Sequence, residues 1–199
     1  MLQLRSILSI PIVYSTFSWL VSGKAARSIL VNEYIRPCPR DTILDIGCGP
    51  GDLVAYLPSE VEYIGFDASA SYIAAAQKRF GTRATFICDR VSTANIKQSF
   101  DIVLAIGILH HLDDSEALQL FHLAQSVLKP TGRLVTLDGV YVNNQSNPAR
   151  WIISKDRGQY VRDQEGYHSL ANQVFKNTKV MIRHDLLRIP YTHIIMECQ

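Results

Sequence analysis

The chain is 199 residues long, 47% hydrophobic and 19% charged, a composition typical of a soluble globular protein. Its 20 lysines and arginines against 18 acidic residues leave a formal charge of +2, so no global field attracts a polyanion such as DNA. These values exclude intrinsic disorder and a fibrous or low-complexity chain. The four cysteines form no Cys-x-x-Cys pair, so we expect neither a disulfide framework nor a cysteine metal site, and a cytoplasmic location.

Residues 7–21 form an apolar N-terminal segment that polar residues and Pro11 interrupt. The segment is short for a transmembrane helix, and we favour a helix that packs on the core. Peripheral contact with a membrane surface is the second interpretation, and a secretory signal is the third. A further helix is predicted at residues 24–34, where apolar residues recur at helical spacing.

From Asp41 onward, short apolar strands alternate with helices. Strands are predicted at residues 42–46, 63–66, 84–88, 101–106 and 133–137. Helices are predicted at residues 51–57, 69–80, 115–128 and 167–174, and a loop passing into a helix at residues 143–161. The alternation predicts βαβ units and a parallel sheet. Two last β-rich stretches, 179–187 and 191–198, are closely joined and must pair antiparallel.

The strongest functional motif is the loop of residues 45–51, Asp-Ile-Gly-Cys-Gly-Pro-Gly, which follows the first predicted strand. Glycines let the backbone approach a ligand closely and adopt positive φ. A dinucleotide fingerprint needs glycine at positions one, three and six, and the sixth residue here is Asp52, which argues against NAD. Asp67 and Asp89 end the next two strands, where carboxylates can accept from ribose hydroxyls and an adenine amino group. Because parallel strands end at one edge of a sheet, these acids outline one nucleoside-shaped site.

With these motifs the sequence resembles the class I S-adenosylmethionine-dependent methyltransferases of the small-molecule type. The resemblance runs from about residue 42 to residue 137 and includes the segment Gly-Ile-Leu-His-His-Leu at 107–112. It implies a Rossmann-like, doubly wound α/β sheet of seven strands, mostly parallel with an antiparallel last strand and helices on both faces. It also implies one domain over 1–199, with an N-terminal helical cap at 1–38 and a catalytic core at 39–199.

The resemblance implies S-adenosyl-L-methionine as the cofactor and S-adenosyl-L-homocysteine as its product. By this resemblance, Gly47 and Gly49 lie along the methionine portion of the cofactor. Asp67 holds the ribose, and Asp89 reads the adenine. The other expected contacts to the cofactor are Asp45, Ala68, Arg90 and Ile106.

Four residues are candidates for acting on the acceptor. The sulfonium makes the methyl group electrophilic, so the protein must place a nucleophile behind it, and a general base helps when that nucleophile is a hydroxyl. His110 is the preferred base and His111 the second candidate, with a structural role as the alternative. Tyr191 and His193 begin the last strand at the same sheet edge, where they either reach the substrate pocket or are ordinary strand residues.

Several charged residues have two interpretations each. Asp113 can orient His110 or cap the helix that follows it. Asp138, after the fifth strand, is either a helix cap or a substrate contact. Arg157 or Arg162 can meet an anionic acceptor, although such charges more often form a solvated helix face.

We therefore expect methyl transfer to a small molecule, such as a hydroxyl of a lipid, glycan or secondary-metabolite intermediate. The alternatives are a protein or nucleic-acid methyltransferase of the same fold and a non-catalytic nucleoside-binding domain. Base-amino methyltransferases carry Asn/Asp-Pro-Pro-aromatic where this chain reads Ile-Gly-Ile-Leu at 106–109, and the weak net charge also argues against nucleic acid. No metal is expected, because Asp113 and Asp114 lie too late for a catechol-type metal site. Tyr14 and Trp19 can form part of a lid, with core packing the alternative for Trp19.

Overall fold

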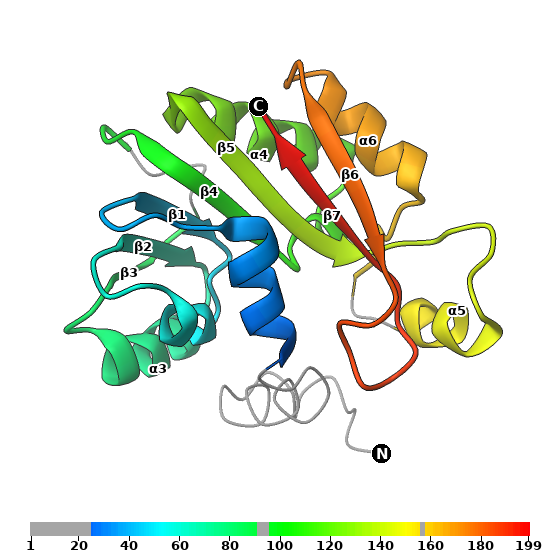
Figure 1. Ribbon diagram of the computed structural model, residues 1–199, viewed down its shortest axis with the longest axis horizontal. Helices are drawn as coiled ribbons and strands as arrows, with labels where there is room; N and C mark the ends of the chain where they lie inside the picture. The colour runs from blue at the N-terminus through cyan, green and yellow to red at the C-terminus, as the bar shows by residue number, and fades with distance from the viewer. Residues whose placement is uncertain (1–24, 91–95, 156–157) are drawn as a thin grey trace.

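The computed structural model describes residues 25–90, 96–155 and 158–199 (Figure 1). A seven-stranded sheet with the order β3-β2-β1-β4-β5-β7-β6 forms its centre. The strands are β1 (Thr42–Ile46), β2 (Glu62–Asp67), β3 (Thr85–Cys88), β4 (Phe100–Ile106), β5 (Leu128–Gly139), β6 (Thr178–Arg183) and β7 (His193–Cys198). Strands β1 to β5 are parallel, and β7 is antiparallel to both β5 and β6. The predicted doubly wound sheet and its antiparallel last strand are confirmed.

The helical elements alternate with these strands as predicted. They are a helix at residues 25–29 that continues as the π-helix η1 (Leu30–Ile35), then η2 (Asp52–Tyr56), α3 (Ala70–Phe80), η3 (Leu109–His111), α4 (Asp114–Val127), α5 (Asn147–Ser154) and α6 (Gln164–Asn172). The Ser69 hydroxyl accepts from the N–H of Tyr72 and starts α3. Asp113 and Glu116 form a capping box at the start of α4, so Asp113 is a helix cap.

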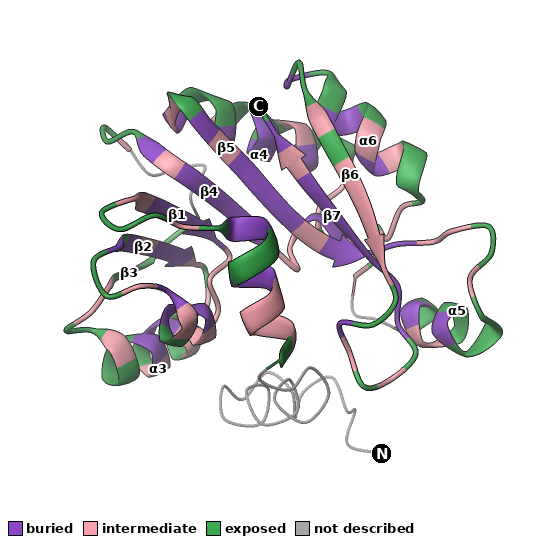
Figure 2. Ribbon diagram, in the orientation of Figure 1, coloured by how far each residue is buried: buried purple, intermediate pink, exposed green. Residues whose placement is uncertain are grey.

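Helices cover both faces of the sheet because the side chains of each strand alternate between them (Figure 1). Leu44 and Ile46 of β1 belong to the apolar cluster that includes α4 and α6. Ile43 belongs to the opposite cluster, which includes η1 and α3. Figure 2 shows that the central strands are buried while β3 and β6 at the edges are partly exposed. This burial on both faces explains the continuous apolar runs that predicted the strands.

Several predicted elements have different bounds, and three of them bear on the site. The helix predicted at residues 51–57 is the short 3₁₀ helix η2, since Leu57 is already extended before Pro58. Strand β5 begins at Leu128 and not at Arg133, because Leu128 already pairs with Phe100 of β4. The pairing then shifts register before Arg133 pairs with Ile102. The charged helix expected to reach Arg162 ends at Ser154.

The N-terminal predictions are tested only in part. The helix predicted at residues 24–34 is confirmed. The segment 7–21, with Tyr14 and Trp19, lies outside the described residues, and so does Arg157. Within the described ranges, no helix is both long enough and apolar enough to cross a membrane.

Candidate active site

Glycines mark the place where the strand order reverses. Strands β1 and β4 are neighbours, while the chain leaves them in opposite directions, which opens a crevice beyond their carboxyl ends. Gly47 follows β1 and Gly107 follows β4, with φ of 78° and 70°. Side chains disfavour this backbone region, and a Cβ on Gly47 would lie 2.7 Å from Cδ1 of Ile108. Glycine is therefore needed where the backbone turns at the crevice.

Two cavities meet at Gly47, with volumes of about 240 and 470 Å³. The predicted residues that line the first are Asp45, Gly47, Gly49, Ile106 and His193. Those that line the second are Gly47, Asp67, Ala68, Asp89, Arg90 and His111. All eight predicted cofactor residues thus gather around two adjoining cavities, which together have the size of a site for one small ligand.

Asp67 ties the glycine loop to the end of β2. Its Oδ2 accepts from the N–H of Gly49 at 2.9 Å, and its Oδ1 accepts from the N–H of Ser69 at 2.8 Å. These backbone donors fix the carboxylate at the rim of the second cavity. A carboxylate has about four lone-pair sites, so both oxygens can still accept from a ligand hydroxyl.

Asp45 places a buried carboxyl beside the first cavity. The Tyr63 hydroxyl donates to its Oδ2 at 2.5 Å, whereas Oδ1 has no hydrogen-bond partner among the described residues. Burial raises the pKa of Asp45 to about 7, the Tyr63 bond opposes that rise, and the charge of Asp67 adds to it. A cation in the first cavity would therefore favour the ionised form of Asp45.

His110 forms a buried pair with Asp138. Its Nδ1 lies 2.7 Å from Asp138 Oδ1, and its backbone N–H donates to the same oxygen at 3.2 Å. Burial raises the pKa of Asp138, and the contact with His110 opposes that rise. An ionised Asp138 accepts from Nδ1–H and leaves Nε2 as the basic atom of the ring. Asp138 is therefore no helix cap but the partner of His110, and Asp113 does not take that place.

The other three candidates lie around the same sheet edge. His111 is exposed and lines the second cavity. Tyr191 and His193 are buried with ring centroids 4.7 Å apart, and His193 lines the first cavity. Gly139 pairs with His193 across β5 and β7, and a Cβ on Gly139 would collide with the Tyr191 hydroxyl. Asp138, the partner of His110, is followed at the end of β5 by Gly139, which contacts Tyr191 and His193. The two pairs of side chains therefore lie next to each other.

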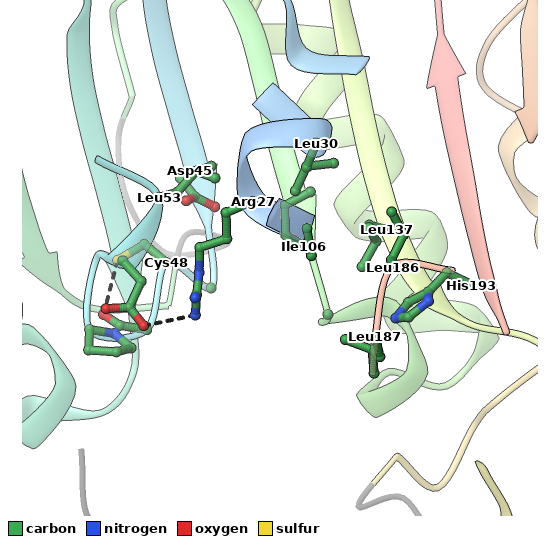
Figure 3. Close-up of a pocket in the computed structure, with 16 residues that line it drawn as sticks. Arg27, Leu30, Asp45, Cys48, Leu53, Ile106, Leu137, Leu186, Leu187 and His193 are labelled. Carbon is green, nitrogen blue, oxygen red and sulfur yellow. Dashed lines mark hydrogen bonds and ion pairs between the residues drawn. The ribbon is translucent and has the colours of Figure 1, made fainter. Parts of the chain in front are cut away.

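The sequence pattern missed an apolar wall and an arginine. Leu137, Leu186 and Leu187 gather beside His193 on one side of the first cavity (Figure 3). On the other side Arg27 lies near Asp45 and pairs with Asp52 at 3.1 Å (Figure 3). Strand β6 ends at Arg183, so both loop leucines lie in a nine-residue connection, 184–192, and not in the predicted strand. Their closeness in sequence to His193 was the available signal, whereas nothing in the pattern pointed to Arg27.

Comparison with known sequences agrees with this geometry. Residues 43–132 match the family described as a methyltransferase domain. The ubiquinone biosynthesis O-methyltransferase of Bradyrhizobium sp. is 34% identical over 97 residues, which cover 47% of this chain and 38% of that protein. The chain spans well under half the length of the first curated relatives that it matches.

Solved structures share the fold. Haemonchus contortus phosphoethanolamine N-methyltransferase 2, in complex with phosphomonomethylethanolamine and S-adenosylhomocysteine, has a TM-score of 0.75 at 18% identity over 98% of this chain and 58% of that one. Human N-acetylserotonin methyltransferase in complex with SAM has a TM-score of 0.70 at 16% identity over 97% and 58%. At such low identity the likeness establishes the fold.

Proposed function

We propose that this member of the class I S-adenosylmethionine-dependent methyltransferases transfers a methyl group to an apolar small-molecule acceptor. The observation that carries the proposal is the pair of cavities that meet at Gly47. The second presents carboxylates suited to a nucleoside, and the first ends on an aliphatic wall close to a buried His–Asp pair.

The residues of both cavities suit the cofactor. Asp67 and Asp89 would hold the ribose and the adenine in the second cavity, with Ala68 and Arg90 beside them. The glycine loop leaves room for the methionine portion, because a Cβ on Gly49 would meet nothing within 4 Å. The Oδ1 of Asp45, which has no hydrogen-bond partner in the described part of the chain, would accept from a ligand ammonium group. When bound, the cofactor supplies an electrophilic methyl group.

His110 is proposed to remove the proton from an acceptor hydroxyl. The His110 ring is not part of the lining of either cavity, but its Cε1 lies 3.9 Å from the Cβ position of Gly107, which lines the first cavity. Nε2 would take the proton while Asp138 stabilises the imidazolium that forms. An O-methyltransferase among the relatives supports a hydroxyl acceptor. Tyr191 and His193 would then line the acceptor side, and His111 the cofactor side.

The apolar wall supports one class of acceptor over the others. Leu137 and the two loop leucines, Leu186 and Leu187, offer apolar surface and few hydrogen-bonding groups. Such a wall favours a lipid or an apolar metabolite over a glycan, whose hydroxyls would be left without partners.

The four cysteines are all free, which supports a reducing, cytoplasmic location.

Calorimetric titration with S-adenosylhomocysteine, with NADH as the control, tests the cofactor. We expect binding of the first ligand alone, and binding of NADH alone would contradict the proposal. An acceptor screen with a labelled methyl donor then separates an enzyme from a non-catalytic binding domain. Transfer only to nucleic acid or protein would replace the proposed acceptor class while leaving the cofactor in place.

A further inference from the structure

Residues 158–163, which we call the strap, connect the end of the α5 region to α6 and lie against η3, the turn that carries His110. The N–H of Tyr160 donates to the carbonyl oxygen of His110 at 3.0 Å. A Cβ on Gly158 would lie 2.7 Å from that oxygen and 2.8 Å from Cγ of the imidazole. Glycine therefore allows the strap to pack directly on His110.

Arg162 of the strap holds both ends of the turn. Its guanidinium donates to the carbonyl of Leu109 at 3.0 Å and to that of Leu112 at 2.8 Å, the two residues that bracket His110 and His111. The Arg162 side chain is 10% exposed, whereas its ion-pair partner Asp114 is 77% exposed. An ion pair to so exposed a carboxylate contributes little, so the main partners of Arg162 are backbone carbonyls, the two of the turn and that of Tyr160 at 3.1 Å.

The strap is itself anchored to the strand end that supplies Asp138. The N–H of Tyr141, just beyond β5, donates to the carbonyl of Arg162 at 3.1 Å, and Tyr141 forms a bridge with Asp163. Asp163 accepts from the N–H of Gly166 at 2.8 Å and caps α6. His110 is consequently held from two directions, by Asp138 through its ring and by the strap through its backbone.

We propose that Arg162 is a positioning residue that fixes the η3 turn and thereby keeps the His110 imidazole on Asp138, beside Gly107 of the first cavity. The positioning stands on the contacts alone, and its catalytic consequence rests on the proposed function. Arginine suits this task because its planar fork serves several acceptors at once, whereas a lysine serves them from a single atom. Arg162 is thus committed to the turn and belongs neither to a solvated helix face nor to an anion site.

Histidine NMR on the full-length protein tests the positioning without an acceptor. In protein labelled at the histidine Cε1 positions, with His110 assigned by His110→Gln, we compare Arg162→Ala, Arg162→Lys and the wild type across pH. We expect the His110 signal and its titration midpoint to change in Arg162→Ala and to return partly in Arg162→Lys. The signals of His168 and His184 should stay, and affinity for S-adenosylhomocysteine should remain within about two-fold.

Two controls separate positioning from general stability. Asp114→Asn removes only the negative charge of the exposed partner of Arg162 and should leave the His110 titration unchanged. Arg183→Ala removes a comparable arginine that bonds Glu33, Tyr34 and Asp185 far from η3 in the sequence, and it should not move the His110 signal. A wild-type His110 titration in Arg162→Ala would overturn the proposal. So would equal shifts of all histidines in Arg162→Ala and Arg183→Ala.

Gly158→Ala keeps the test decisive if Arg162→Ala does not fold. The added methyl should displace the His110 ring and change the same signal, and an unchanged signal would contradict the packing on which the proposal depends. Once an acceptor is known, Arg162→Ala should lower turnover by about 10²-fold at unchanged KM for the cofactor. Failure of the proposed function would appear separately, as missing cofactor binding or methyl transfer with an intact effect on His110.

Discussion

On the proposed cofactor side of the crevice, the expected contacts lie at or near the carboxyl ends of successive strands: Gly47 comes after β1, Asp67 ends β2 and Asp89 comes after β3. On the proposed acceptor side, the contacts join residues far apart in the chain. His110 meets Asp138 across 28 residues, and Arg162 reaches the Leu109 carbonyl across 53. The contacts on the cofactor side can therefore be predicted from local sequence motifs, whereas those on the acceptor side form only when distant segments pack together. Changes on one side should leave the function of the other largely intact.

The largest expected effect is a loss of turnover without any loss of cofactor affinity, which would distinguish the acceptor side from the cofactor side. His110→Ala should lower turnover by about 10²–10⁴-fold, the range of a lost general base, while affinity for S-adenosylhomocysteine is retained. Asp138→Asn should lower turnover similarly, because the imidazole loses the partner that fixes its tautomer. Single-turnover transfer from labelled cofactor measures both, with His168→Ala, at a partly exposed histidine, as the control. Full rates in His110→Ala and in His111→Ala would show that neither histidine is the base.

Asp45 links the cofactor side to pH. Because its pKa in the folded protein is about 7, above that of an ordinary carboxyl, the folded state holds this proton more tightly than the unfolded chain. The resulting stabilisation is full below about pH 4 and is lost as the pH rises through about 7. Between pH 5 and pH 8 the wild type should lose about 3 kcal/mol of its free energy of unfolding through Asp45, and Asp45→Asn should not show this loss.

Urea unfolding of the wild type and Asp45→Asn at both pH values measures this difference. Asp89→Asn, at an exposed carboxyl, serves as the control and should follow the wild type. Identical pH dependence in wild type and Asp45→Asn would mean that the buried carboxyl stays ionised over this range.

Asp67→Ala should weaken binding of S-adenosylhomocysteine by about 100-fold, which corresponds to about 2.7 kcal/mol. The substitution removes the proposed ribose acceptor and also releases the N–H of Gly49 that holds the loop. Calorimetry measures the loss, and circular dichroism checks that the fold persists. Unchanged affinity would overturn the assigned ribose contact, whereas a changed His110 titration would show that the two sides are coupled.

The smallest effect concerns Asp113. Asp113→Ala removes the capping box of α4 and should lower stability by about 1 kcal/mol with turnover unchanged. Thermal unfolding and the transfer assay together check this expectation. A large loss of turnover at wild-type stability would instead restore the interpretation in which Asp113 orients His110.

The sequence by itself determined the sheet, the glycine turn and the acids at the strand ends. Apolar runs, glycine spacing and the residue after each strand are local features, and the geometry of parallel sheets then brings these positions to one edge. Only the tertiary structure decided that Asp138 pairs with His110, that Leu186 and Leu187 form the apolar wall, and that Arg162 holds the turn. These contacts depend on the pairing of β5 with β7 and on the path of the strap, and no periodicity in the chain encodes how side chains so distant in sequence meet.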